Sequence, residues 1–213
     1  MFKRLLLSLM LLSPLPSVAE DNGESYVEGV QYDLIVPAIR TANPDKIEVV
    51  EFFWYGCGHC YNLEPLLEQW RKELGEDVDF RGSPANWRPQ PMELHAKAFY
   101  TAEALGVLDT MHTVIFQAMN IDRKRLNSEG EIGALFAANG VPLEQFTRAF
   151  NSFGVGSQIR QADARARSAR ITGTPELMVN GKYRISTGKA GSSADMLKVA
   201  KFLIEKERAA RGG

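Results

Sequence analysis

Two cysteines, Cys57 and Cys60, are the residues of this sequence best suited to covalent chemistry. They are the only cysteines among 213 residues and stand in the segment Cys57-Gly58-His59-Cys60. This spacing suits a pair that cycles between a dithiol and a disulfide, with a thiolate as the attacking group. The pattern therefore indicates thiol–disulfide exchange.

The pair lies between a predicted strand and a predicted helix. Residues 46–53 form a short, near-continuous apolar run rich in β-branched and aromatic residues, which predicts a buried strand. Residues 62–74 show helical spacing, and Pro65 within them predicts a kink. A thiolate at a helix N-terminus faces unpaired N–H groups and the positive end of the helix dipole, which lower its pKa.

This placement predicts different roles for the two sulfurs. Cys57 is nearer the strand end and is expected to be the exposed, attacking sulfur. Cys60 lies one turn into the helix and is expected to be the buried, resolving thiol. His59 can add positive charge and a hydrogen-bond donor. Stabilising the thiolate stabilises the reduced form, which makes the disulfide a stronger oxidant.

Three alternative roles for the pair fit less well. A structural zinc site needs four ligands, and beyond the cysteines only His59, His95, His112 and carboxylates are available. A c-type haem would require His after the second Cys, where Tyr61 stands. A permanent structural disulfide would close only a small loop and so add little stability. His95 and His112 lie on amphipathic segments and are predicted to be packed or surface residues.

The N-terminus predicts export. Lys3 and Arg4 precede an apolar run over residues 5–12, and residues 17–19 are a small-residue cleavage pattern. Residues 1–19 are thus expected to be a cleaved signal peptide. A retained membrane anchor is the alternative, but the run is shorter than the ~20 residues of a membrane span. We expect a periplasmic protein with no stable membrane insertion.

Composition excludes other classes of function. The formal net charge is −1, with 24% charged and 45% hydrophobic residues. This balance provides no basic surface for nucleic acid and no polybasic membrane segment.

The rest of the chain predicts two kinds of structure. Residues 78–82 are predicted to form a second strand, and Asn180-Gly181 between two short apolar runs predicts a β-hairpin over 177–185. The other segments have helical patterns; they are 93–105, 109–120, 129–139, 143–151, 158–170 and 194–210. Ser128 and Glu131 resemble a capping box.

Two separated segments resemble DsbA-type proteins of the thioredoxin superfamily. They are Glu-Phe-Phe-Trp-Tyr-Gly-Cys-Gly-His-Cys (residues 51–60) and Thr-Gly-Thr-Pro-Glu-Leu-Met-Val-Asn-Gly-Lys-Tyr (residues 172–183). The resemblance covers essentially the whole mature chain. It implies a thioredoxin-like α/β fold from residues 20–83 and 156–213, with an inserted α-helical domain over residues 84–155.

The resemblance also implies further site residues. Pro175 is expected to be a cis-proline facing the cysteines, the alternative being a trans proline that ends the loop. The backbone of Thr174 is expected to pair with an extended substrate peptide. Glu51 is expected to lie beneath the disulfide and to assist proton transfer to the buried thiol, with a pKa raised by burial. The alternative for Glu51 is a solvated strand residue.

Two departures from the family pattern affect the expected oxidising strength. Many DsbA-like proteins have Pro where this chain has Gly58, and Val where it has Thr174. Gly58 loosens the turn between the cysteines, and Thr174 places a hydroxyl near the sulfurs.

The sequence therefore predicts an enzyme that introduces disulfide bonds into unfolded or reduced exported proteins. Its electrons are carried by Cys57 and Cys60, with no bound cofactor or metal. By resemblance, a DsbB-like membrane protein reoxidises the pair, and the enzyme is a monomer. Two alternatives stay open: a periplasmic reductase or isomerase, and a chaperone-like peptide-binding module with a structural disulfide.

Overall fold

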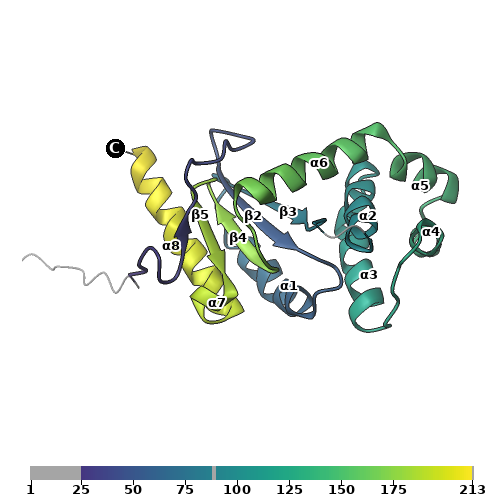
Figure 1. Ribbon diagram of the computed structural model, residues 1–213, viewed down its shortest axis with the longest axis horizontal. Helices are drawn as coiled ribbons and strands as arrows, with labels where there is room; N and C mark the ends of the chain where they lie inside the picture. The colour runs from purple at the N-terminus through teal and green to yellow at the C-terminus, as the bar shows by residue number, and fades with distance from the viewer. Residues whose placement is uncertain (1–24, 88–89, 213) are drawn as a thin grey trace, which may run out of the picture.

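A mixed five-stranded sheet forms the half of the molecule that carries the cysteines (Figure 1). The computed structural model describes residues 25–87 and 90–212, so the predicted signal peptide lies outside the described residues. In the sheet order β1-β5-β4-β2-β3, the β2–β3 pair is parallel and the other pairs are antiparallel. The strands are β1 (Asp33–Leu34), β2 (Ile47–Phe53), β3 (Val78–Pro84), β4 (Glu176–Val179) and β5 (Tyr183–Ser186).

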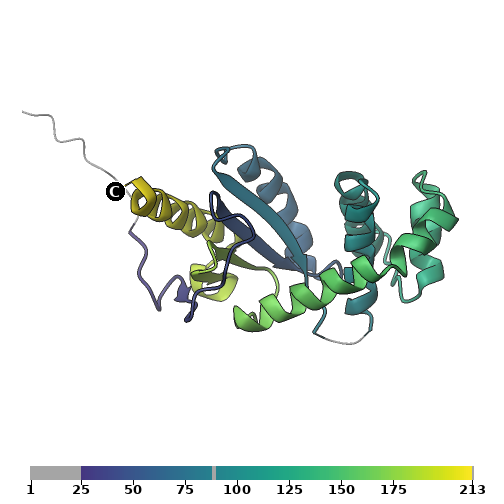
Figure 2. The same ribbon diagram turned by 90° about the horizontal axis from the view of Figure 1, so that it is seen from above.

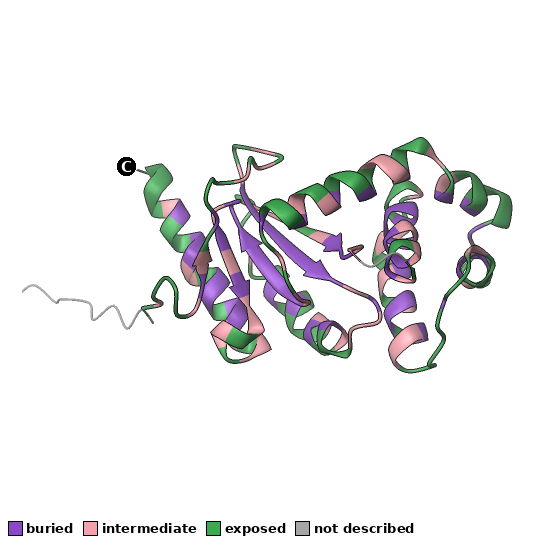
Figure 3. Cartoon of the chain, in the orientation of Figure 1, coloured by how far each residue is buried: buried purple, intermediate pink, exposed green. Residues whose placement is uncertain are grey.

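Helices cover both faces of this sheet, and the interior strand β2, between β4 and β3, is buried along its whole length (Figure 3). On one face, Val49 and Leu177 pack with side chains of α1 (Gly58–Arg71) and α8 (Ser193–Gly212). On the other face, Phe52 and Met178 pack against Ala166 of α6 (Phe153–Ser168). Burial on both faces explains why β2 is a near-continuous apolar run rather than an alternating one.

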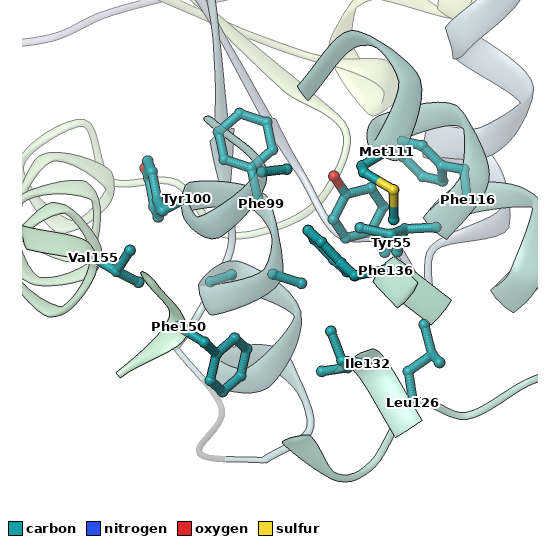
Figure 4. Close-up of a cluster of buried hydrophobic side chains, with 14 of the residues drawn as sticks. Tyr55, Phe99, Tyr100, Met111, Phe116, Leu126, Ile132, Phe136, Phe150 and Val155 are labelled. Atoms are coloured by element: carbon teal, nitrogen blue, oxygen red, sulfur yellow. The ribbon is translucent and has the colours of Figure 1, made fainter. Parts of the chain in front are cut away.

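A second core joins the helical half of the molecule to the end of β2. Side chains of the helical half surround Phe53 and Tyr55, whose exposed fractions are both 0%; Figure 4 shows Tyr55 among them. The helix α6 begins in this half and ends over the sheet, crossing the predicted boundary at residue 155 (Figure 2). The other helices of this half are α2 (Met92–Ala104), α3 (Leu108–Asn120), α4 (Glu129–Ala138) and α5 (Leu143–Phe150).

The predicted elements are confirmed, with shifted ends. The helix α1 begins at Gly58 and continues through Pro65, and α6 begins five residues before its predicted start. That earlier start follows from Ser152, whose hydroxyl accepts the N–H of Val155 at 3.2 Å. Two short elements, β1 and α7 (Thr187–Ala190), were not predicted because neither carries a periodic apolar pattern.

Local signals also hold in detail. Asn180 and Gly181 have φ values of 50° and 67°, the left-handed conformation that a two-residue hairpin turn requires. Ser128 caps α4 by accepting the N–H of Glu131 at 3.2 Å. The Glu131 carboxylate accepts the N–H of Asn127 at 2.9 Å rather than that of Ser128, so the capping box is only half formed.

Candidate active site

The junction of β2 and α1 holds the two cysteines as the sequence predicts. Cys57 is the N-cap of α1, with φ −95° and ψ 110°, and Cys60 lies in the first turn of the helix. Both are free thiols; Cys57 is partly exposed and Cys60 has an exposed fraction of 0%. Only Cys57 is therefore open to attack from solution.

Hydrogen bonds stabilise the thiolate of Cys57. They hold the pKa of this thiol at about 5, against an ordinary value of 9.0. The largest cause is the hydrogen bond from the Cys60 side chain; burial opposes it, and the Thr174 side chain and the backbone N–H groups of Cys60 and His59 add to it. The backbone contribution is the helix N-terminus effect predicted from sequence.

Cys60 has the opposite electrostatics. Burial raises the pKa of its thiol far above the ordinary value, and the hydrogen bond to Cys57 and the nearby charges of Glu51 and Cys57 raise it further. One thiol of the pair is thus ready to ionise, and the other holds its proton.

The two residues between the cysteines are exposed. His59 acts on Cys57 through its backbone N–H, whereas the sequence suggested its side-chain charge. Gly58 begins α1, and a Cβ built on it would meet no atom within 4 Å. The site therefore has room for a side chain at this position.

A loop distant in sequence faces the cysteines. The Thr174–Pro175 peptide bond is cis, as predicted from the resemblance. The Cys57 thiol donates to the backbone carbonyl of Thr174, with 3.4 Å between the sulfur and the oxygen. Pro175 is followed directly by β4, so the sheet itself holds this loop beside Cys57.

Glu51 lies buried in β2, with 2% of its surface exposed, so the alternative of a solvated strand residue is wrong. Burial raises its pKa well above 4.5; the charges of Glu64 and Cys57 act in the same direction, and Arg71 opposes them. Its Oε1 has no hydrogen-bond partner among the described residues. Its carboxyl group is therefore biased towards holding a proton near Cys60.

His112 belongs to a polar cluster that sequence reasoning did not foresee. Its Nδ1 lies 2.9 Å from the hydroxyl of Tyr55, and its Nε2 lies 3.3 Å from Oε1 of Glu64. The ring also packs edge-on against Phe53 and Phe116. The prediction of a packed histidine is confirmed, but the contact between α3 and α1 has no local sequence signal.

His95 is buried, with 1% of its surface exposed. The indole N–H of Trp54 donates to its Nδ1 at 2.9 Å, and its Nε2 lies 3.2 Å from the carbonyls of Arg125 and Leu126. Because Nδ1 accepts, the proton lies on Nε2 and the ring is neutral. His95 thus anchors Trp54, as a packed residue.

A cleft of about 1500 Å³ reaches Glu51, Glu64 and His112 between α1, β3 and the helices α2, α3 and α6. It gives solvent a route towards the buried carboxyl group of Glu51. In residues 25–87 and 90–212, no group of three or more His, Cys, Asp or Glu side chains is placed to bind a metal ion. In the same ranges, no helix has the length and apolar character needed to cross a bilayer.

Comparison with known proteins gives a consistent set of relatives. Residues 48–200 match the family model of the DSBA-like thioredoxin domain. The thiol:disulfide interchange protein DsbA of Azotobacter vinelandii is 43% identical over 183 residues, covering 86% of this chain and 85% of that protein. The DsbA of Pseudomonas syringae pv. tomato is 37% identical over 209 residues, covering 98% and 97%. The crystal structure of Pseudomonas aeruginosa DsbA superimposes with a TM-score of 0.84 at 39% identity, covering 88% of this chain and 97% of that chain.

Proposed function

The chain belongs to the DSBA-like thioredoxin domain family and is a thiol–disulfide oxidoreductase that introduces disulfide bonds, and we propose that Cys57 and Cys60 perform this exchange. The observation that carries the assignment is the contrast between the two thiols. Cys57 is partly exposed with a pKa of about 5, whereas Cys60 is buried with a raised pKa. Cys57 is therefore the sulfur exchanged with substrate, and Cys60 is the resolving thiol.

The reaction starts from the oxidised pair. A substrate thiolate attacks Sγ of Cys57, the bond between Cys57 and Cys60 breaks, and Cys60 leaves as a thiolate. A second substrate thiolate then attacks the substrate sulfur of the mixed disulfide and releases Cys57. The low pKa of Cys57 makes its thiolate a good leaving group. The substrate gains a disulfide and the enzyme keeps two electrons as a dithiol.

The buried Cys60 thiolate must gain a proton during the first step. Glu51 supplies it in this proposal, because burial raises the pKa of this carboxyl and its charge acts on Cys60. The cleft that reaches Glu51 lets solvent return the proton.

The proposed substrates are unfolded or reduced exported proteins in the periplasm. The backbone of Thr174, held beside Cys57, pairs with the extended substrate peptide. A DsbB-like membrane oxidant restores the disulfide, and the enzyme acts as a monomer without a bound cofactor. In this proposal residues 84–155 form the helical domain that is inserted into the thioredoxin-like fold.

The deciding measurement is the reduction potential of the pair, equilibrated against glutathione. A disulfide donor has a reduction potential well above that of thioredoxin, which is about −270 mV. A potential near or below that value would point instead to a reductase. Replacing both cysteines by Ser separates the chaperone-like alternative, because a pure peptide-binding module keeps its activity and an oxidant loses it.

A further inference from the structure

Two oppositely charged side chains of the β4–β5 hairpin reach the loop that faces Cys57. Glu176 directly follows Pro175, and Arg184 lies on β5. Glu176 pairs with Ser186 and Met178 pairs with Arg184, so Glu176 and Arg184 are diagonal neighbours on one face of the sheet. Glu176 is buried, with 3% of its surface exposed.

The carboxylate of Glu176 binds the backbone of this loop. Its Oε1 accepts the N–H of Gly173 at 2.8 Å and the N–H of Thr172 at 3.2 Å. The same oxygen accepts the hydroxyl of Thr172 at 3.2 Å. Thr174, the next residue, is the one whose carbonyl accepts the Cys57 thiol.

Arg184 holds the other end of the loop. Its Nη1 donates to the carbonyl of Arg170, a residue in the left-handed conformation with φ 55°. Its Nη2 donates to Asp33 of β1 at 2.9 Å, which fixes the guanidinium. Its Nε lies 3.8 Å from Oε2 of Glu176, an oxygen with no hydrogen-bond partner in the described part of the chain. Residues 170–175 are thus tied to the hairpin at both ends.

The contribution of Glu176 to the stability of the fold does not by itself explain why an acidic residue stands at this position. Burial raises the pKa of Glu176, which means that its carboxylate is costly to keep charged, although the loop hydrogen bonds and Arg184 offset part of this cost. Replacing a buried ion pair as a whole by apolar residues of similar volume often costs no stability, whereas removing one partner alone does. The three hydrogen bonds to Thr172 and Gly173, by contrast, require an acceptor at this point.

From these contacts we propose that Glu176 is a positioning residue for disulfide exchange, which fixes residues 172–174 beside Cys57 and so sets the affinity for the substrate peptide. The proposal rests on the proposed function, in which Thr174 pairs with substrate. Glu176 touches neither sulfur; it acts through the loop.

The test compares Glu176→Met, which keeps the volume and removes the acceptor, with Glu176→Gln, whose amide oxygen can accept the same bonds. Kinetics with a reduced two-cysteine peptide give kcat and KM. For Glu176→Met we expect KM to rise about tenfold, equivalent to about 1.4 kcal/mol, with kcat changed less than about twofold. The pKa of Cys57 should rise from about 5, because the Thr174 side chain helps to lower it. Glu176→Gln should restore both values.

Glu207→Met is the matched control. The Glu207 carboxylate is also buried and binds the same hairpin, accepting from Lys182 at 2.7 Å and Tyr183 at 2.9 Å, away from the loop. This variant should lower Tm and leave KM and the Cys57 pKa unchanged.

Two outcomes would overturn the proposal. A change in Tm alone for Glu176→Met, as in the control, would make Glu176 a structural residue. Equal impairment of Glu176→Gln and Glu176→Met would assign the effect to the charge facing Arg184. If the wild-type protein fails to oxidise the peptide, the proposed function fails, while the Cys57 pKa of the two variants still tests the positioning of the loop.

Discussion

Removing the hydrogen bond from Cys60 should raise the pKa of the Cys57 thiol. This bond is the largest cause of the low value of about 5. A hydrogen bond to a charged group contributes about 1.5–3 kcal/mol, and one pKa unit corresponds to about 1.4 kcal/mol. Cys60→Ala should therefore raise the pKa of Cys57 to between about 6 and 7, since burial, the Thr174 side chain and the helix N-terminus are unchanged.

Cys60→Ser is the matched variant, because its hydroxyl keeps a donor at the same place. The pKa of Cys57 in the Cys60→Ser variant should stay at about 5. Each variant has a single thiol, so the ultraviolet absorbance of the thiolate titrates Cys57 alone. The rate of alkylation against pH provides a second measurement of the same pKa.

Equal pKa values near 5 in the two variants would refute this reasoning. The backbone N–H groups and Thr174 would then account for the low pKa without Cys60. Equal values near the ordinary 9.0 would also refute it, because the helix N-terminus would then contribute nothing.

The same site supports three more predictions. The pKa of Cys57 is lower in the folded reduced protein than its ordinary 9.0, so the reduced protein should gain stability as pH rises from 5 towards 9 and lose it as pH falls through 5. Urea unfolding measures the free energy of unfolding of the reduced protein minus that of the oxidised protein. Between pH 5 and 7 this difference should grow by at most about 3 kcal/mol, and by less after solvent screening. The raised pKa of Glu51 has the opposite effect on stability, which falls as pH rises above 4.5. Glu51→Gln should therefore stabilise the protein by about 1–3 kcal/mol at neutral pH, with no gain at acid pH. The same substitution should slow disulfide exchange about 100-fold in stopped-flow assays. His112→Phe should leave the Tyr55 hydroxyl unpaired and the Glu64 carboxylate without its imidazole neighbour, lowering the free energy of unfolding by about 1–3 kcal/mol, whereas unchanged stability would exclude a contribution from this cluster.

Family resemblance supplied what spacing could not. The cis bond before Pro175 and the burial of Glu51 were predicted from matching segments, and the structure has both. The cis bond has no signal in composition or periodicity, since a proline before a strand is compatible with either isomer. The burial of Glu51 also agrees with its place inside the apolar run over residues 46–53.

Most secondary-structure elements and the reacting pair are encoded locally in the sequence; the short elements β1 and α7, which carry no periodic apolar pattern, are not. An apolar run, a helical period and two cysteines at their junction each involve only neighbouring residues. They can therefore be recognised without knowledge of the tertiary contacts. The burial of Cys60 followed from its place one helical turn inside α1. The hairpin followed from Asn180-Gly181, because few other dipeptides adopt the left-handed conformation at both positions.

Which groups meet at the site depends on the tertiary fold. The Cys57 thiol contacts the carbonyl of Thr174, 117 positions away, and Tyr55 contacts His112, 57 positions away. His59 contributes to the thiolate through its backbone, although its side chain suggested a charge effect. In the sequence Glu176 is an ordinary polar residue beside a proline, yet in the fold it holds the loop that faces the active site. Such contacts depend on how the sheet brings distant strand ends together, and this depends on the packing of the whole core rather than on any one segment.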